Sequence, residues 1–209
     1  MRNLPHKTIE RLSQYRRSLL GCLAQGKTNI FSHEIAHLHH ITPVQVRRDI
    51  MLIGYSGNLR KGYDVKDLIE LIGRIIDVEA GQKVAMIGIG NLGKAMISYF
   101  KGKRAKLSIA AGFDVNPGKI DKVYDGVPVY HIDRLQEIIK KENIAIAVIT
   151  VPAEQAPEIA EMLVLAGIKG ILNYTPKALN VSPHVYLEEY DMITSLEKVA
   201  FFAKRASAG

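Results

Sequence analysis

The sequence predicts an α/β protein with a small helical N-terminal domain followed by a parallel β-sheet covered by helices. Three observations support this prediction. From residue 82 onward, apolar segments of strand length alternate with helix-like segments, which is typical of a parallel sheet. A glycine-rich turn follows the first of these strands. The excess positive charge lies before residue 63: residues 1–62 contain 10 Lys and Arg against 3 Asp and Glu, whereas residues 63–209 contain 18 of each.

The composition limits the class of protein. At 209 residues and 47% hydrophobic residues, the chain is expected to fold around a substantial core. The longest uncharged apolar run, residues 144–153, is too short to span a bilayer. The first residues lack the apolar segment of a signal peptide. The single cysteine, Cys22, excludes an internal disulfide and is expected at a buried helix position. We therefore expect a cytoplasmic protein with no membrane partner.

The N-terminal region has the pattern of a helix-turn-helix. Apolar residues recur at helical spacing over residues 8–24, and residues 28–31 form a short extended piece. Ser32 is expected to cap a helix over residues 34–38. Thr42 is expected to cap the next helix, residues 44–53, with Pro43 in its first turn. Two helices joined by a short turn are the arrangement that places a second helix in the major groove of DNA.

A wing is expected to complete this domain. Residues 54–63 are rich in Gly, Asn, Arg and Lys and indicate a hairpin, and residues 64–78 indicate a helix. The domain boundary is expected near residues 79–81, so residues 1–79 form a winged helix-turn-helix domain. Its basic character favours a polyanionic partner, the simpler alternative being a merely soluble basic surface. The residues expected to contact DNA are Thr42, Gln45, Arg47 and Arg48 on the second helix and Arg60 and Lys61 on the wing.

One motif in this region is expected to be coincidental. His33-Glu34-Ile35-Ala36-His37 matches the HExxH pattern of zinc proteases. No convincing third ligand follows it on another helix, and Ile35, Ala36 and Leu38 are the apolar positions that a helix-turn-helix needs. We therefore expect no metal site, and histidines on a solvated helix surface instead.

The glycine-rich turn predicts nucleotide binding. An apolar strand, residues 83–87, leads into Gly88-Ile89-Gly90-Asn91-Leu92-Gly93, and residues 93–100 form a helix. In this motif the first glycine allows a tight turn, the second lets the backbone approach a pyrophosphate, and the third lets the helix pack close to the strand. The free N–H groups of the helix N-terminus then face the phosphates. A Rossmann-type domain is expected over residues 80–190.

An acidic residue at the end of the next strand favours NAD over NADP. Asp114 follows the apolar run 107–113 and lies 26 residues after Gly88. Its carboxylate accepts hydrogen bonds from the ribose hydroxyls and repels a 2′-phosphate. The expected cofactors are therefore NADH and NAD.

The alternation continues to the end of the chain. Strands are expected over residues 144–151, 170–174 and 185–188, and a short strand or loop over residues 127–130. Helices are expected over residues 132–141 and 154–166. A last helix over residues 191–205 has a broad apolar face that water does not favour. Either this helix covers its own sheet or it packs against a second subunit.

Taken in order, these motifs closely resemble the redox-sensing transcriptional repressor Rex family. The residues that carry the resemblance extend over nearly the whole chain: residues 42–49, 88–94, 113–117, 150–152 and 167–174. The resemblance implies a homodimer whose C-terminal helix, residues 191–209, is swapped between subunits. It implies repression of genes at an inverted-repeat operator in double-stranded DNA when NADH is low, and release from DNA when NADH binds.

The resemblance also assigns site residues. The cofactor would be bound by Gly88, Ile89, Gly90, Asn91, Leu92, Gly93, Lys94, Tyr99, Asp114, Thr150, Val151 and Pro152. The switch residues would be Arg17, Tyr99 and Asp191, with the arginine and the aspartate pairing across domains in the NADH state. The chain departs from the family pattern at Met192 and over residues 51–60.

Two other classes remain as alternatives: an NAD-dependent dehydrogenase and a CoA- or nucleotide-binding module without DNA binding. A dehydrogenase usually needs a Lys, His or Asp that acts on the carbonyl oxygen of its substrate. Little sequence remains after the cofactor strands for a substrate domain, and the later histidines, His131 and His184, are expected in structural or surface positions. The basic helix-turn-helix also has no role in such an enzyme, so we expect no enzymatic activity.

Overall fold

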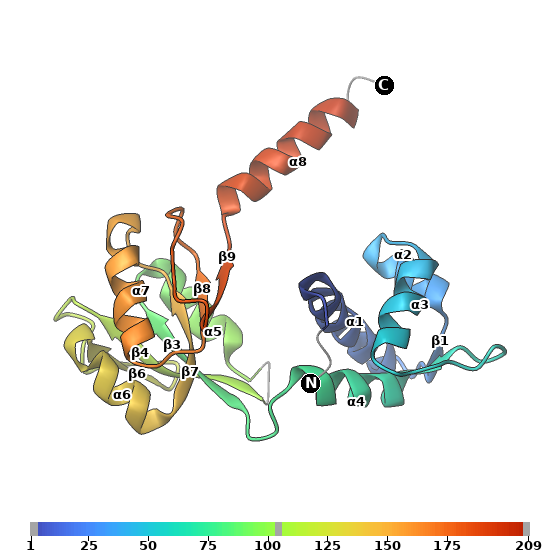
Figure 1. Cartoon of the computed structure of the whole chain (residues 1–209), viewed down its shortest axis with the longest axis horizontal. Helices are drawn as coiled ribbons and strands as arrows, with labels where there is room; N and C mark the ends of the chain where they lie inside the picture. Colours follow the sequence, from blue (N-terminus) through green and yellow to red (C-terminus); the bar gives the residue numbers. More distant parts are fainter. Residues whose placement is uncertain (1–3, 103–105, 207–209) are drawn as a thin grey trace. The chain divides into compact units, whose positions relative to one another are not determined.

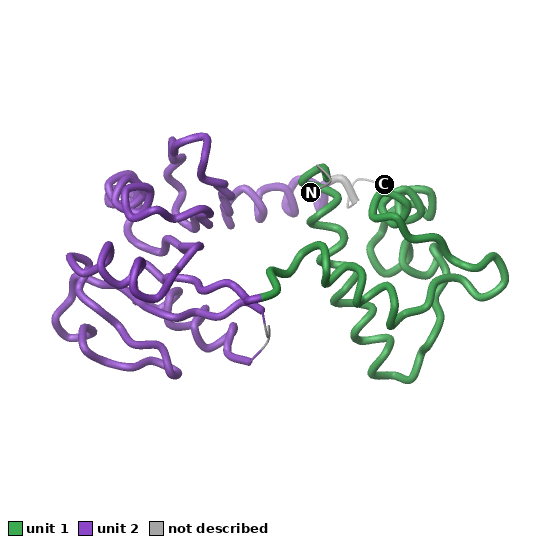
Figure 2. The backbone as a smooth tube through the Cα atoms, turned by 60° about the horizontal axis from the view of Figure 1, so that its bottom comes forward, with its two compact units in different colours: residues 1–79 green, residues 80–209 purple. Residues whose placement is uncertain are grey.

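The computed structural model describes residues 4–102 and 106–206. The chain forms two compact units that divide between Glu79 and Ala80 (Figure 2). Each unit has its own hydrophobic core.

The N-terminal unit consists mainly of helices. Its elements are α1 (His6–Ala24), β1 (Asn29–Ile30), α2 (Ser32–His39), α3 (Pro43–Leu52), β2 (Tyr63–Asp64) and α4 (Val65–Ile76). The two short strands pair antiparallel, Ile30 opposite Tyr63. Apolar side chains from all four helices meet in one core that includes Leu12, Ile35 and Ile50. This core fixes α3 against the rest of the unit.

Side chains satisfy backbone N–H groups at the starts of α2 and α3. Thr42 caps α3, as expected, because its hydroxyl accepts a hydrogen bond from the N–H of Gln45 at 3.2 Å. The prediction that Ser32 caps α2 is wrong: Ser32 is the first helical residue. The carboxylate of Glu34 reaches back instead to the N–H of Phe31 at 2.8 Å, which satisfies a donor at the helix start.

A hairpin lies between α3 and β2. Asn58 and Gly62 exchange two backbone hydrogen bonds of 2.7 Å each. The side-chain oxygen of Asn58 also accepts the N–H groups of Arg60 and Lys61, at 2.8 and 3.2 Å. The turn that carries these cations is therefore held by hydrogen bonds within the hairpin, from its backbone and from the side chain of Asn58.

The second unit contains a doubly wound sheet. Its elements are β3 (Gln82–Ile87), α5 (Asn91–Phe100), β4 (Leu107–Asp114), β5 (Val123–Tyr124), β6 (Val127–His131), α6 (Leu135–Glu142), β7 (Ile144–Ile149), α7 (Ala156–Leu165), β8 (Gly170–Asn173), β9 (Tyr186–Glu189) and α8 (Met192–Ala206). The strand order is β5-β6-β4-β3-β7-β8-β9, and every pair is parallel except β5 with β6 (Figure 1). This is the strand order of a dinucleotide-binding Rossmann fold with β5 added at one edge.

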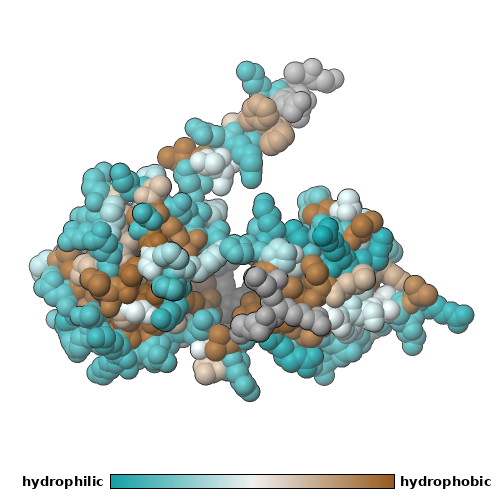
Figure 3. All heavy atoms as spheres, viewed as in Figure 1, coloured by the Kyte–Doolittle hydropathy of each residue, from teal (hydrophilic) through white to brown (hydrophobic). Residues whose placement is uncertain are grey.

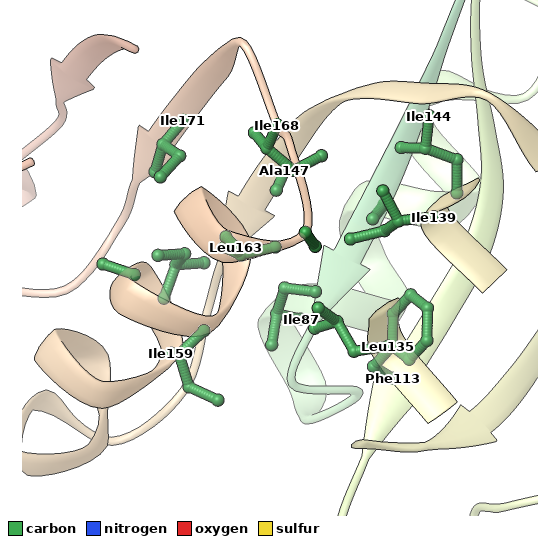
Figure 4. Packing of buried hydrophobic residues seen from close by; sticks show 14 of the residues in the cluster. Ile87, Phe113, Leu135, Ile139, Ile144, Ala147, Ile159, Leu163, Ile168 and Ile171 are labelled. Atoms are coloured by element: carbon green, nitrogen blue, oxygen red, sulfur yellow. The ribbon is translucent and has the colours of Figure 1, made fainter. Parts of the chain in front are cut away.

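The two faces of the sheet have separate cores. On one face, side chains of α6 and α7 such as Leu135 and Leu163 pack against Ile87, Phe113 and Ala147 of the strands (Figure 4). On the other face, Met96 and Ile97 of α5 pack against a different set of strand residues. Helices on both faces account for the near-continuous apolar strands of the sequence.

Several boundaries differ from the prediction. The helix expected over residues 132–141 begins as a 3₁₀ turn, Ile132–Arg134, before α6. Likewise, the helix expected over residues 154–166 begins as a 3₁₀ turn, Ala153–Gln155, before α7. Strand β5 was not predicted, because two residues carry no periodic signal. Cys22, expected to be buried, is only partly buried and packs at the edge of its core.

Helix α8 exposes its apolar side chains. Met192, Ile193, Leu196, Val199, Phe201 and Phe202 are each between 55% and 63% exposed. Apolar residues are visible along this helix in Figure 3. The alternative in which α8 covers its own sheet is therefore not observed, and the helix presents an exposed apolar surface. Within the described residues, no helix is both long and apolar enough to cross a membrane.

Candidate functional site

The glycine-rich turn leaves β3 in a conformation that only glycine adopts readily. Gly88 has φ +90°, and a Cβ there would lie 2.8 Å from the carbonyl oxygen of Thr150. The hydroxyl of Thr150 donates to the carbonyl oxygens of Gly88 and Ile87, at 2.7 and 3.0 Å. The turn is thus held between β3 and the end of β7.

The other two glycines have contrasting surroundings. A Cβ at Gly93 would lie 2.2 Å from the carbonyl oxygen of Gly88, so this glycine permits close packing of α5 on the turn. A Cβ at Gly90 would meet no atom within 4 Å. The space beside Gly90 is open at the point where α5 begins, so a phosphate group has room to approach the free N–H groups of the helix.

A cavity of about 380 Å³ lies at the carboxyl ends of β3, β4 and β7. It is lined by the turn residues Gly88 and Gly90, by Asp114, and by Thr150, Val151 and Pro152, together with Ile87, Phe113, Val115, Asn116, Lys119, Ile132, Gln155 and Ile159. The carboxyl ends of strands at the point where the strand order reverses are where open α/β sheets bind nucleotides.

Asp114 lines this cavity and is only 8% exposed. Its carboxylate accepts the N–H groups of Ile89 and Asn116, at 2.8 and 2.9 Å, and the ammonium of Lys119, at 2.9 Å. Burial opposes its ionisation, but the hydrogen bonds from Lys119, Asn116 and Ile89 outweigh burial and hold the pKa of Asp114 below its usual range. The residue is therefore a carboxylate at neutral pH.

Six of the expected cofactor residues do not line the cavity with the others. Ile89 has a fully buried side chain and contributes its backbone N–H to Asp114. Lys94 on α5 lies over the ring of Tyr124, with Nζ 4.7 Å from the ring centroid. Tyr99, near the end of α5, is 60% exposed and stacks edge-on with Phe100. Asn91, Leu92 and Gly93 form the first turn of α5.

Sequence reasoning missed Lys119. The sequence signal was Asn116-Pro117-Gly118, a turn-forming run shortly after Asp114, in which the side chain of Asn116 accepts the N–H of Gly118 at 2.8 Å. This turn brings Lys119 back to Asp114. The cavity thus combines a glycine turn, a helix N-terminus and a buried carboxylate, which fits a dinucleotide whose adenosine ribose hydroxyls reach Asp114.

The candidate nucleic-acid surface lies on α3. Asp49 lies on the buried side of this helix, where it is fully buried and accepts hydrogen bonds from Arg11 and Tyr15 of α1. Burial opposes its charge, but Arg11 and Tyr15 outweigh burial and hold the pKa of Asp49 below its usual range. The amide nitrogen of Gln45 donates to Asp49 at 3.0 Å, which orients this side chain.

The expected DNA-contacting cations are all exposed. Arg47 and Arg48 lie on the outer side of α3, and Arg47 donates to the hydroxyl of Ser32 at 3.1 Å. Arg60 and Lys61 lie at the hairpin turn described above. Helix α3 therefore presents two guanidinium groups on the face opposite its buried residues, as a helix that enters the major groove requires.

The expected switch residues are divided between the units. Arg17, on α1 in the N-terminal unit, is exposed. Asp191 precedes α8 in the second unit, and its carboxylate accepts the N–H of Ile193 at 2.9 Å and the hydroxyl of Thr194 at 2.6 Å. Asp191 thus caps α8.

The HExxH residues do not assemble a metal site. His33 and His37 are exposed, while Glu34 is held by Lys27 and by the N–H of Phe31. In the described parts of the chain, no group of three His, Cys, Asp or Glu side chains could hold a metal ion.

Comparison with known proteins identifies the family. The chain is 37% identical over 201 residues to the redox-sensing transcriptional repressor Rex of Geobacillus kaustophilus (strain HTA426), with 96% of this chain and 94% of the relative covered. It is also 37% identical over 204 residues to the Rex protein of Bacillus subtilis (strain 168), with 98% and 94% covered. The chain belongs to the Rex family. The resemblance inferred from sequence motifs is confirmed.

Solved Rex-family structures have the same fold over the whole chain. The structure of RSP, a Rex-family repressor, in complex with NAD⁺ and operator DNA is 28% identical, with a TM-score of 0.89 and coverage of 100% of this chain and 96% of that one. The structure of RSP with NADH is 27% identical, with a TM-score of 0.88 and coverage of 100% and 98%. Two family models also match: "CoA binding domain" over residues 79–177 and "Putative DNA-binding protein N-terminus" over residues 3–50.

Proposed function

We propose that this Rex-family chain is a transcriptional repressor that binds operator DNA when NADH is low and leaves it when NADH binds. The observation that carries the proposal is the presence, in one chain, of a dinucleotide cavity bounded by Gly88, Gly90 and Asp114 and of a basic helix-turn-helix that exposes Arg47 and Arg48. The relatives named as redox-sensing repressors, and RSP with its two cofactor forms and operator, support the same function.

The proposed roles in DNA binding follow from side-chain chemistry. Arg47 and Arg48 would donate to guanine O6 and N7, and Gln45 to adenine, in the major groove. Thr42, at the start of α3, and the wing residues Arg60 and Lys61 would contact phosphates and fix the register of the protein on the duplex. Gln45 already gives one N–H to Asp49, which leaves its second N–H and its carbonyl oxygen for a base.

The proposed cofactor site uses backbone and side chains in different ways. The free N–H groups at the start of α5, from Gly90 to Gly93, would face the pyrophosphate, and Asp114 would bind the adenosine ribose. NAD⁺ carries a positive charge on its nicotinamide, whereas NADH is neutral there. An environment formed by Val151 and Pro152 of the cavity lining would be mostly apolar and would disfavour an unpaired cation, so it would favour NADH. Tyr99, which lies outside this lining, would have to approach the nicotinamide to add to it.

The proposed assembly is a homodimer in the cytoplasm. The exposed apolar surface of α8 needs a covering partner, and a second copy of the chain that exchanges α8 supplies one. A two-fold dimer would require an inverted-repeat operator. In the NADH state Asp191 would pair with Arg17, which would favour the form released from DNA.

We also propose that the chain is not a dehydrogenase. The two ionisable residues among those that line the cavity, Asp114 and Lys119, pair with each other. Neither is then available to act on the carbonyl oxygen of a second substrate. His131 and His184 do not line the cavity.

The deciding experiment is a pair of NADH titrations, one of the free protein and one of the protein–operator complex. Coupling between two sites is reciprocal: if NADH weakens DNA binding, DNA weakens NADH binding by the same factor, on the order of 5–150-fold. NAD⁺ serves as the matched control ligand. Equal NADH affinities in the two titrations would show that the cofactor has no signalling role.

A further inference from the structure

Apolar side chains lie among the cations on the exposed face of α3. Val44 is 64% exposed and Met51 is 70% exposed. Together with Arg47, Arg48 and Leu52 they line an open groove of about 470 Å³. The groove therefore combines two guanidinium groups with hydrocarbon surface.

The spacing puts these residues on one stripe of the helix. Val44, Arg48 and Met51 follow one another at intervals of four and three residues, and Arg47 lies beside them. The opposite side of α3, with Val46, Asp49 and Ile50, is buried in the core. Single exposed apolar residues are ordinary, but here two of them flank the cations along the same outward face.

The side chains of this groove match the major-groove edges of guanine and thymine. In the major groove of DNA, guanine offers two acceptors to an arginine, and thymine is the base that presents a methyl group. We propose that Val44 and Met51 contact thymine methyl groups that neighbour the guanines bound by Arg47 and Arg48, and that these contacts help to specify the operator. This proposal rests on the proposed function, because it requires α3 to enter the major groove.

The test removes the methyl groups without changing the protein. An operator is first selected from a random duplex pool in the absence of NADH. Its thymines are then replaced by uracil, one position at a time and together, which removes each methyl group and keeps the base-pairing edge. Each contacted methyl group should contribute roughly fourfold to affinity, the value expected for burial of one carbon group.

A paired protein variant assigns the effect to these residues. The double variant Val44→Asn, Met51→Gln, which replaces both apolar side chains with polar ones, should bind the thymine and uracil operators with similar affinity, and it should keep its Arg-dependent binding. Leu165→Ala, at a 76% exposed leucine on α7, is the matched control and should keep the preference for thymine. Melting temperatures measured for all variants verify that the fold is retained.

Each outcome has a distinct meaning. Equal binding of thymine and uracil operators by the unmodified protein would overturn this proposal while leaving the proposed function intact. Persistence of the thymine preference in the double variant would overturn the assignment to Val44 and Met51. Failure to bind any duplex without NADH would overturn the proposed function as well.

Discussion

Arg11 holds Asp49 in a two-pronged ion pair, with Nε 2.6 Å and Nη2 2.8 Å from the two carboxylate oxygens. The hydroxyl of Tyr15 adds a third donor at 2.9 Å. Because Arg11 and Tyr15 belong to α1 and Asp49 belongs to α3, this network ties the candidate recognition helix to the first helix of its unit. Removing one partner of a buried ion pair strongly destabilises the folded state, because the other charge is left without compensation.

Asp49→Ala should destabilise the N-terminal unit by about 3–5 kcal/mol. Hydrogen exchange of the α1 and α3 amides, measured in native buffer, reports on this unit separately from the sheet domain. Glu70→Ala, at an exposed position of α4, is the control and should change little. Unchanged protection of the α3 amides in the Asp49 variant would contradict the proposed role of the network.

The same network should make the N-terminal unit sensitive to acid. The pKa of Asp49 is lower in the folded protein than the ordinary value of about 3.9 that it would have in the unfolded chain. The stabilisation is therefore complete above about pH 5 and is lost as the pH falls through 4 toward the folded pKa. In the Asp49→Asn variant, the hydrogen-exchange protection of the α3 amides should change less as the pH falls over this interval. Parallel acid profiles for the two proteins would argue against this source of stability.

Two glycines of the nucleotide turn should give opposite phenotypes. Gly93→Ala should destabilise the second unit, because its Cβ would clash with the carbonyl oxygen of Gly88. Gly90→Ala should fold normally, because its Cβ meets no protein atom, but it should weaken NADH binding by filling the space proposed for the pyrophosphate. Thermal melting and NADH titration of both variants separate the two effects. Normal NADH affinity in Gly90→Ala would place the phosphates elsewhere.

The sequence predicted the sheet and its nucleotide turn well, because both depend on local signals. The strands of the central sheet are apolar runs, and Gly88 and Gly93 are required by backbone geometry that is visible in their spacing. The helix-turn-helix was predicted for a similar reason, since Thr42 and Pro43 specify a helix start through bonds within one turn.

The sequence did not reveal which charged side chains pair with one another. Asp49 looks like an ordinary charged helix residue until α1 brings Arg11 and Tyr15 against it, 38 and 34 positions away. Lys119 was missed because its pairing with Asp114 depends on how the intervening turn folds back. The first pair depends on tertiary packing and the second on the geometry of a turn, and hydrophobic periodicity encodes neither.

Lys119 should influence cofactor choice once Asp114 is removed. Asp114→Ala should weaken NADH binding by about tenfold through loss of a charge-assisted ribose contact. The same change frees Lys119 to meet a 2′-phosphate, so the preference for NADH over NADPH should narrow. In the double variant Asp114→Ala, Lys119→Ala, the affinity for NADPH should fall below that of the single variant, because no cation remains to meet the 2′-phosphate. Fluorescence titration of the unmodified protein and the two variants with both cofactors measures the six affinities, and an undiminished NADH preference in Asp114→Ala would contradict the role assigned to the carboxylate.

Asp191 offers a way to separate two roles that its position combines. Its carboxylate caps α8 through Ile193 and Thr194, and we propose that its charge pairs with Arg17 in the NADH state. Asparagine is as good a helix cap as aspartate but carries no charge. Asp191→Asn should therefore keep α8 intact and still reduce NADH-induced release from the operator, as should Arg17→Ala.

The comparison with Asp191→Ala completes the argument. Alanine removes both the cap and the charge, so this variant should also lose about 1 kcal/mol of helix stability. Operator affinity is measured with and without saturating NADH for each variant, and NADH binding to the free protein is measured in parallel. If the asparagine variant responds to NADH like the unmodified protein while the alanine variant does not, Asp191 acts only as a cap, and the proposed pairing with Arg17 is wrong.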